Sequence, residues 1–588
     1  MTAPMAAGTD TTPRPGSRAD RMSHPRAIDT LKTVAQIHGV CVRPIVLRRT
    51  DRDTGQTDII EVPCGATLAA KCKPCAEKGR RRRIQQIREG WHLDTEPTVP
   101  VKPAGDDVLE LVRLRAHLEF ERNEAERTAQ WAHVADLDEG ITDVDEAIAA
   151  TGLRGHLTPE SRTPKPRKTR STRRRNDTPE LPRLPVENRT VGRAFTGRAG
   201  KAHRPSMLLT LTLGSYGPVH TCQRRGTALM TCGCGVLHGQ RDDILGTPLD
   251  PDSYDYRRAA LDAIHFARVM DRFWQNLRRA VGWKVQYAGA VELQKRLAPH
   301  AHYTIRGAIP RKLLRQVAAA TYHQVWWPPF DEQLYSVDRP PVWDPDSTRY
   351  VDPKTGQPLP TWLEATTAIA DDADPAYVAR LGSIDPREMR GVEAGTKDAE
   401  RAIRYVTKYV TKNLADTAAP RGEHARAHFD RLHTELAILP CSPSCANWLL
   451  YGVQPDHAKP GLVPGRCTGK VHQADTLGFT GRRVLISRNW SGKTLTDHRH
   501  DNHTWVKAIL AGHLADGSDD QADEANRPGR YTFEHARPDD PDVPPLQYRL
   551  LRTVHQRIAW KEALAKARAR TSNAVPATQD PPTSSIAA

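Results

Sequence analysis

The sequence lacks features that would place the chain at a membrane or outside the cell. No apolar run approaches the length of a membrane-spanning helix, and the first twenty residues lack the apolar core of a secretory signal peptide. Hydrophobic residues make up only 38% of the chain, and the mean hydropathy is −0.61. We therefore expect a soluble protein of the cytoplasm. With 588 residues, it exceeds what one hydrophobic core usually serves, so several domains are expected.

The sequence also lacks an internal repeat and a nucleotide-binding loop of the helicase type. The stretch SRNWSGKT (487–494) ends as a phosphate-binding loop does, but Ser487 stands where the first glycine should be. No helicase domain is therefore expected in this chain.

Positive charge is in excess, with 86 Lys and Arg against 70 Asp and Glu, which gives a formal charge of +16. Much of the excess gathers in the runs RRRR (80–83) and RTPKPRKTRSTRRR (162–175). A single charge run is typical of a solvated segment. Several runs within a basic chain favour a polyanionic partner, which is most often nucleic acid.

The ten cysteines fall into three groups whose spacings favour metal over disulfides in a cytosolic chain. The first group offers four thiolates, the second offers three thiolates with His472, and the third offers three with His238 or His220. The groups are Cys41, Cys64, Cys72 and Cys75; Cys441, Cys445 and Cys467; and Cys222, Cys232 and Cys234. Because four-ligand sites leave no position for a substrate, the expected ion is structural Zn²⁺. Buried thiols without metal are the alternative.

A different donor set lies on two predicted strands. In LAPHAHYTIRG (297–307), His300 and His302 are two residues apart and therefore face the same way on a strand. Glu292, on the preceding predicted strand, is the nearest further donor and adds the oxygen ligand that Mg²⁺ or Mn²⁺ prefers. Two imidazoles and a carboxylate predict a metal site that activates a phosphate. The alternative is a pair of core histidines.

The segment YVTKYVTK (405–412) lies in a predicted helix. Tyr405 and Tyr409 are four residues apart and share one helical face, and Lys408 and Lys412 follow them at a spacing of three. A tyrosine with a pKa of about 10 is a poor nucleophile at neutral pH. A nearby ammonium group and a metal-polarised phosphate lower the barrier to its attack. The alternative is an amphipathic helix with half-buried tyrosines.

Read in order, the strand LLTLTL (208–213), the His-x-His strand and the Tyr-x-x-Lys helix resemble the three motifs of the HUH endonucleases. The doubled tyrosine resembles the two-tyrosine rolling-circle replication initiators. The stretches RRAALDAIHFARVMDRFWQNLRRAVG and AATYHQVWWPP resemble initiators of actinobacterial conjugative and integrative plasmids. The resemblance covers roughly residues 41–92 and 206–495. Ala301, between the histidines, is smaller than the hydrophobe often found there in the family.

The resemblance implies a mechanism and partners. Tyr409 or Tyr405 would attack a phosphodiester at a plasmid origin, keep a 5′-phosphotyrosine link and free a 3′-OH primer. Tyr409 ranks first, because it aligns best with the KYxxK element of single-tyrosine relatives. The implied partners are double- and single-stranded origin DNA, a host helicase and a DNA polymerase. Two alternatives stay open: an HUH relaxase or transposase, and a noncatalytic zinc-bearing DNA-binding regulator.

The expected fold is α+β, with a central antiparallel sheet that carries the histidines between flanking helices. A second His-x-His, at His498 and His500 in DHRHDNH, is expected in a polar surface loop. The expected order of segments is a disordered tail (1–40), a four-cysteine zinc module (41–92), an acidic helical insertion and basic linker (93–200), an HUH domain (201–416, with insertions 214–253 and 328–395), a zinc module of three cysteines and one histidine (417–500), a basic helical region (501–570) and a disordered tail (571–588).

Overall fold

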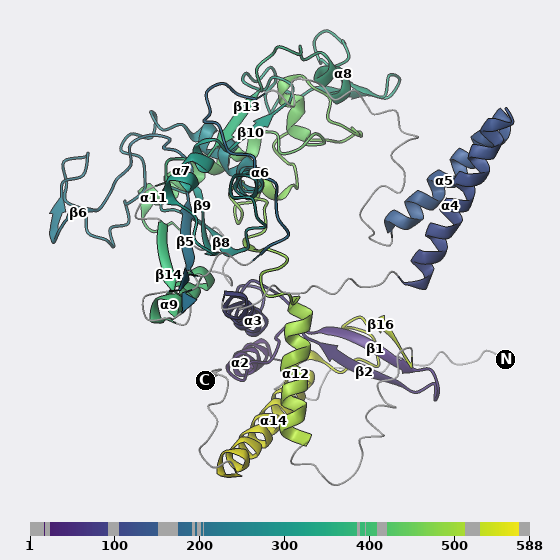
Figure 1. The fold of residues 1–588 in the computed structure, drawn as a ribbon, viewed down its shortest axis with the longest axis vertical. Helices are drawn as coiled ribbons and strands as arrows, with labels where there is room; N and C mark the ends of the chain where they lie inside the picture. The colour runs from purple at the N-terminus through teal and green to yellow at the C-terminus, as the bar shows by residue number, and fades with distance from the viewer. Residues whose placement is uncertain are drawn as a thin grey trace, which may run out of the picture. The chain divides into compact units, whose positions relative to one another are not determined.

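The computed structural model is drawn in Figure 1. It describes residues 17, 24–91, 105–150, 174–190, 195–196, 202–203, 205–384, 389–393, 396–408, 420–511 and 530–574. The chain divides into two compact units, of which the smaller comprises Thr98–Arg174 with Asp371–Ala373. Helices and strands are both present, so the expected α+β class is confirmed. Among the described helices, none is long and apolar enough to cross a membrane.

The larger unit contains a sheet whose described strands run antiparallel in the order β14-β5-β9-β8-β15. These strands are β14 (Met389–Glu393), β5 (Pro205–Leu211), β9 (Pro299–Arg306), β8 (Tyr287–Leu293) and β15 (Val484–Ile486). The three inner strands coincide with the predicted strands: LLTLTL overlaps β5, the His-x-His strand is β9, and the strand that carries Glu292 is β8. The two edge strands come from segments that we had assigned to an insertion and to the second zinc module, so both segments belong to the central sheet.

One face of this central sheet packs on helix α6 (Tyr256–Val281). Successive side chains of a strand point to opposite faces, so Ala301, Tyr303 and Ile305 share this face, and all three are fully buried. The ring of Trp274 on α6 meets Tyr303 edge-on, with 4.9 Å between the ring centroids. This apolar face fixes the register, because a slip of one residue would turn it away from the core.

The opposite face of the central sheet packs on helices α9 (Lys397–Thr407) and α3 (Lys73–Trp91). Ile403 and Val406 of α9 recur at helical spacing and bury their side chains against Ala288 of β8. The predicted helix that carries YVTKYVTK (405–412) is therefore present as far as Thr407. The part of this segment from residue 409 lies outside the described residues.

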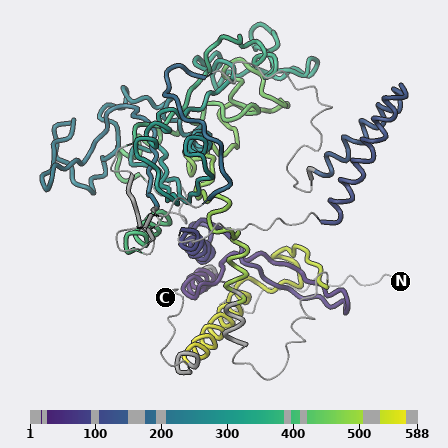
Figure 2. Tube along the Cα trace, viewed as in Figure 1, coloured from purple at the N-terminus to yellow at the C-terminus, as the bar shows by residue number. Residues whose placement is uncertain are grey.

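Segments from opposite ends of the chain form a second sheet in the larger unit. Strand β1 (Ile45–Asp51) pairs on one side with β2 (Thr57–Val62) and on the other with β16 (Tyr531–His535), and all pairs are antiparallel. Helix α2 (Pro25–Ile37) packs against α14 (Leu546–Ala574). Figure 2 shows these purple and yellow segments together.

This arrangement differs from the order of segments that we expected. Residues 25–37 are helical although a disordered tail was expected over 1–40. The C-terminal region supplies a strand and a helix to the first cysteine module. Sequence distance hid this connection, because strand pairing across more than 480 residues leaves no periodic signal in either segment.

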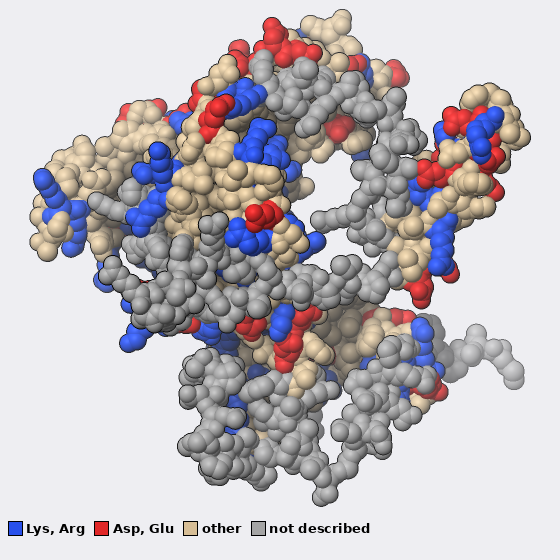
Figure 3. All heavy atoms as spheres, in the orientation of Figure 1, with Lys and Arg blue, Asp and Glu red and all other residues tan. Residues whose placement is uncertain are grey.

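The smaller unit contains a hairpin of helices α4 (Asp106–Arg127) and α5 (Trp131–Ala150). The guanidinium of Arg115, which is 4% exposed, donates to Asp145 of α5 at 2.7 Å and so ties the two helices together. It also donates to Glu119 of its own helix at 2.6 Å. Acidic and basic side chains are interspersed along this hairpin in Figure 3. The helices expected in the acidic part of segment 93–200 are therefore present as α4 and α5.

The second His-x-His does not lie in a surface loop. It belongs to helix α12 (Leu495–Ala511), and His498 is fully buried there. Its Nε2 lies 3.3 Å from the hydroxyl of Ser491, and its Nδ1 lies 3.2 Å from a carboxylate oxygen of Glu89. The prediction was wrong because α12 packs against α3, which covers a polar helix face that the sequence alone would leave in solvent.

The remaining described elements complete the larger unit. They are β3 (Phe195–Thr196), β4 (Ala202–His203), β6 (Gln223–Arg225), β7 (Ala228–Met230), α7 (Arg311–Ala319), β10 (Tyr322–Val325), β11 (Val342–Asp344), β12 (Arg349–Val351), α8 (Trp362–Thr367), β13 (Tyr377–Arg380), α11 (Glu423–Ile438), η3 (Ala446–Tyr451) and η4 (Lys470–His472). Helix α7 ends at Ala319, and the chain then continues as β10.

Candidate metal and tyrosine site

Three candidate metal ligands meet on the α9 face of the central sheet. Glu292 of β8 is the direct antiparallel partner of His300 on β9, and paired residues project to the same face. His302 follows two residues later on that face. One ligand atom from each residue lies within 4.8 Å of the others. The strand alternation that suggested this group in the sequence therefore holds in three dimensions.

The hydrogen bonds of His302 fix which ring nitrogen can act as a ligand. Its Nδ1 lies 2.8 Å from the hydroxyl of Thr210 on the neighbouring strand β5, which is the register partner of His302. Its Nε2 faces Nε2 of His300 at 2.9 Å. Both Nε2 atoms thus converge on one point. Thr210 was not singled out in the sequence, because only the β5–β9 pairing brings it beside the histidine.

Burial sets the protonation of this group. It lowers the pKa of His300 to about 3 and that of His302 to about 4, so both rings are neutral near pH 7. Burial also raises the pKa of Glu292 to about 7, although the positive charges of Arg483 and Lys408 oppose that shift. Neutral imidazoles keep the lone pairs that bind a metal ion.

A divalent ion fits the donors that are present. Among the described atoms, the buried Oε1 of Glu292 has no hydrogen-bond partner. A buried carboxylate oxygen without a partner is costly, and a cation at the convergence of these three side chains would remove that cost. An imidazole and carboxylate set suits Mn²⁺ or Mg²⁺ better than a thiolate set would.

Tyr405 stands beside these ligands. Helix α9 begins after Thr396, whose hydroxyl caps the backbone N–H of Ala399, and its apolar face anchors it to the sheet. Tyr405 is 41% exposed, and its hydroxyl lies 3.0 Å from Nε2 of His302. The side chain of Lys408 is exposed at the end of the helix. Tyr409 and Lys412, the other half of the predicted constellation, lie outside the described residues.

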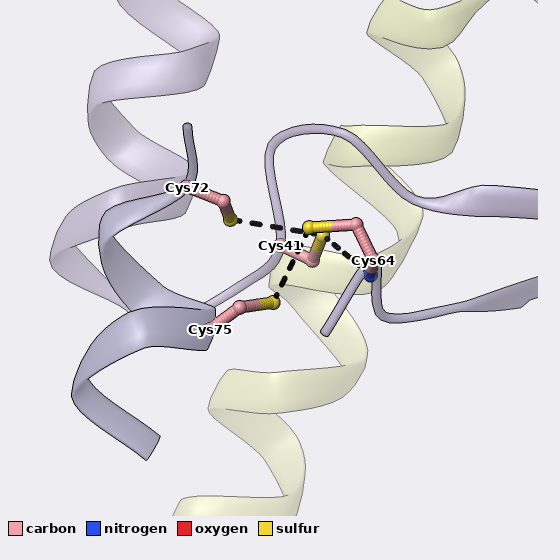
Figure 4. A group of neighbouring side chains, drawn as sticks. All are labelled: Cys41, Cys64, Cys72 and Cys75. Atoms are coloured by element: carbon pink, nitrogen blue, oxygen red, sulfur yellow. Dashed lines mark hydrogen bonds between the residues drawn. The ribbon is translucent and has the colours of Figure 1, made fainter. Parts of the chain in front are cut away.

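The first cysteine group has the spacing of a tetrahedral zinc site (Figure 4). The Sγ atoms of Cys64 and Cys75 are 3.7 Å apart, and those of Cys41 and Cys72 are 3.8 Å apart. A Zn–S distance of about 2.3 Å in a tetrahedron places its sulfurs about 3.8 Å from one another. All four sulfurs lie within 4.8 Å of one another, so these residues could hold a metal ion such as zinc.

The second cysteine group joins three thiols to His472. The Sγ atoms of Cys441 and Cys467 are 4.0 Å apart, and Sγ of Cys445 lies 3.5 Å from Nε2 of His472. Nδ1 of His472 donates to the carbonyl of Leu436 at 2.6 Å, which leaves Nε2 as the ligand atom. The four predicted residues of this group therefore lie together, in a geometry that could hold zinc.

The third group differs from its sequence-based assignment. The structure brings together His220, Cys232, Cys234 and His238, and Cys222 is not among them. His220, which we considered only as an alternative to His238, takes the place of Cys222. Cys222 shares the Cys-rich pattern, but it is His220, whose backbone is held by hydrogen bonds to Gly246 and Thr247, that lies beside the other donors.

Hydrogen bonding in the third group supports a ligand role for His238. Its Nε2 lies 3.1 Å from Sγ of Cys234 and 3.3 Å from Nδ1 of His220. Its Nδ1 lies 3.3 Å from a carboxylate oxygen of Asp242. A carboxylate behind a ligating histidine orients the ring and fixes its tautomer. Asp242 was missed in the sequence, since an i to i+4 acid beside a histidine is common on any surface.

The basic run RRRR lies on helix α3, which contacts the tyrosine helix. Arg88 makes a bidentate pair with Glu400 of α9 at 2.8 and 2.9 Å, and Arg80 donates to the backbone carbonyl of Thr407 at 3.2 Å. Burial and the neighbouring Arg482 lower the pKa of Arg83. Helix α3 therefore supports α9 and also gathers positive charge near it.

Comparison with known proteins identifies the family. A family model described as "Replication initiator protein, pSAM2" (RepSA) matches residues 27–556. The chain is also 28% identical over 228 residues to a protein of Streptomyces ambofaciens named "Replication initiator protein". That alignment covers 36% of this chain and 43% of the relative, so the chain spans less than half of the relative's length. No solved structure matches the chain. Because the family model covers most of its length, the chain belongs to the RepSA family of replication initiator proteins.

Proposed function

We propose that this chain initiates plasmid replication by nicking and rejoining one strand of origin DNA through a tyrosine, in the manner of the HUH endonucleases. The observation that carries the proposal is the position of Tyr405. Its hydroxyl lies 3.0 Å from Nε2 of His302, in the same cluster as His300 and Glu292. A phenol beside a cluster of metal ligands is the arrangement that phosphodiester attack by tyrosine requires.

Glu292, His300 and His302 would hold the divalent ion, which would polarise a phosphate oxygen when bound. Attack by the phenolic oxygen forms a Tyr–O–P bond and breaks the P–O3′ bond. The enzyme keeps the 5′-phosphate, and the phenol proton is formally returned to the 3′-oxygen. The products are a covalent 5′-phosphotyrosine and a 3′-OH that a polymerase can extend.

The packing of α9 would orient the nucleophile. Ile403 and Val406 are fully buried on one side of the helix, whereas Tyr405 projects beside the metal ligands. The pair between Arg88 and Glu400 ties the same helix to α3. Tyr409 is four residues after Tyr405 in the sequence, a spacing at which two helical residues share a face, so we propose that one tyrosine starts a round of replication and the other ends it.

Positive charge on α3 would hold the DNA backbone near this site. Burial lowers the pKa values of Arg82 and Arg83 on α3, and the like charges of Arg499 and Arg482 lower them further. Basic groups from separate segments that gather in this way favour a polyanion between them. Release of counterions from DNA would make binding fall steeply with salt.

The test uses purified protein, supercoiled plasmid that carries the cognate origin, and Mg²⁺ or Mn²⁺. We expect conversion to open circle and a covalent adduct whose 5′-phosphate maps to the peptide with Tyr405 and Tyr409. Plasmid without the origin is the control. A protein that shifts the origin DNA but leaves it supercoiled would instead be a noncatalytic regulator.

A further inference from the structure

A basic cleft lies at the end of β8 that is remote from Glu292. Its volume is about 400 Å³. It is formed by the C-terminal end of α6, the residues before β8 and the loop that follows β15. No acidic residue is among the described residues that line it. Four of the lining residues are basic, namely Arg278, Arg279, Lys284 and Arg488.

Helix-end electrostatics explain only part of this charge. Arg278 and Arg279 are in the last turn of α6, where cations offset the negative end of the helix dipole. Lys284 and Arg488 come from other segments and need a different reason to be there. Nζ of Lys284 donates to the side-chain oxygen of Asn188 at 2.7 Å, which neutralises none of its charge. A site of this composition attracts an anion.

Gln286 provides a second observation in the same cleft. It is only 4% exposed, and its Nε2 donates to the backbone carbonyl of Lys284 at 2.8 Å. Its Oε1 is buried and has no partner among the described atoms. An unpaired buried acceptor is costly and calls for a donor from a ligand. Phosphate has no such donor near neutral pH apart from its singly protonated form, whereas nucleobases carry N–H groups.

The cleft and the metal ligands lie along one strand. Gln286 precedes Glu292 by six residues, and a strand rises about 3.3 Å per residue, so the two sites are about 20 Å apart. A strand of DNA that passes the tyrosine could reach the cleft within a few nucleotides.

We propose that this cleft binds one nucleotide of the origin strand at a fixed distance from the nicked bond, with the basic side chains on its phosphate and Gln286 on its base. The inference rests on the proposed function. It adds a second contact that sets where along the strand the tyrosine acts. The ligand is a phosphate-bearing nucleotide, which in principle could also be free in solution, and the experiment separates the two sources.

The test is the salt dependence of origin binding by Arg279→Gln/Arg488→Gln, two exposed positions whose change leaves the core intact. The slope of log affinity against log salt should fall by about 1, because both arginines contact the one phosphate of the bound nucleotide and each neutralised phosphate contributes about 0.9. Gln286→Met, which keeps the side-chain volume, should weaken binding by about fivefold without changing that slope. The matched control is Arg315→Gln/Arg426→Gln, two exposed arginines outside the cleft.

The outcomes separate this inference from the proposed function. A short oligonucleotide that reaches only the tyrosine should be nicked equally by the wild type and by the cleft variants. If the wild type fails to nick it, the proposed function fails, while the binding slopes still judge the cleft. Unchanged slope and affinity in the cleft variants would overturn the inference. So would micromolar binding of a free nucleotide that depends on Arg279 and Arg488 while DNA binding does not.

Discussion

Three of the candidate metal groups in the described residues have four donors each, whereas the group on the central sheet has three donors and a tyrosine beside them. The four-donor groups are built largely from thiols on turns and helix ends. The three-donor group is built from imidazoles and a carboxylate on adjacent strands. Donor number and donor type thus differ together in one chain.

Under the proposed function, this difference would separate structural sites from a reactive one. Four thiolate or imidazole donors complete a tetrahedron around zinc and leave no place for a substrate. Three donors leave positions open, and Tyr405 lies where a reacting group would be needed. Support differs as well, because paired strands hold Glu292 and His300 rigidly, whereas turns let cysteines adjust to the ion.

The largest expected effect is the loss of folding when a donor of a four-donor group is removed. Cys445→Ala, at a buried donor of the second cysteine group, should remove one zinc per chain and unfold that region, since structural zinc contributes on the order of 10 kcal/mol in small zinc domains. Elemental analysis and thermal unfolding give the readout, and the wild type should carry two to three zinc ions. Cys222→Ala is the matched control and should keep them all. Zinc-free protein that folds normally would contradict this prediction.

The next largest effect is the loss of nicking when the tyrosines beside the three-donor group are changed. Tyr405→Phe/Tyr409→Phe keeps the rings and removes both hydroxyls, so nicking of the origin should fall by about 10⁴-fold or more. Tyr409→Phe alone should mainly impair initiation, and Tyr405→Phe alone should mainly impair termination. Rates of open-circle formation and strand transfer measure the two steps. Tyr548→Phe, at a half-exposed position on α14, should be neutral. Full nicking by the double variant would show that α9 is a packing helix only.

Removal of the two imidazoles of the three-donor group should have a smaller effect on nicking. His300→Ala/His302→Ala should slow nicking by about 10²- to 10³-fold, because a bound metal ion supplies several kcal/mol of charge stabilisation. Origin binding should persist, since basic side chains supply most of the affinity. The zinc content should equal that of the wild type, which distinguishes the three-donor group from the four-donor groups. His424→Ala, at an exposed position, is the control. Undiminished nicking in Mg²⁺ would remove the metal assignment.

The smallest effect is expected at Thr210, whose hydroxyl contacts the ring of His302. Thr210→Val keeps the side-chain shape but removes the hydroxyl that lies 2.8 Å from Nδ1 of His302. The ring would lose its fixed tautomer, and metal affinity should fall by about tenfold. Titration of nicking against Mn²⁺ concentration measures this. An unchanged midpoint would mean that packing alone orients His302.

Local periodicity explains how much of the site could be predicted from the sequence. A period of two residues places His300 and His302 on one face of β9, and helical spacing separates Tyr405 from the buried Ile403 and Val406. These patterns act within a few residues, so they are written directly in the sequence. The same holds for Cys72 and Cys75, whose spacing of three residues at the start of α3 places both in the first cysteine group.

Tertiary structure decided what joins segments that are far apart in the chain. Thr210 meets His302 only because β5 pairs with β9, and β16 joins the first cysteine module from the other end of the chain. His220 replaces Cys222, and His498 is buried, because packing selects among side chains that the sequence presents as equals. Such choices depend on the summed free energy of many long-range contacts, which no short pattern encodes.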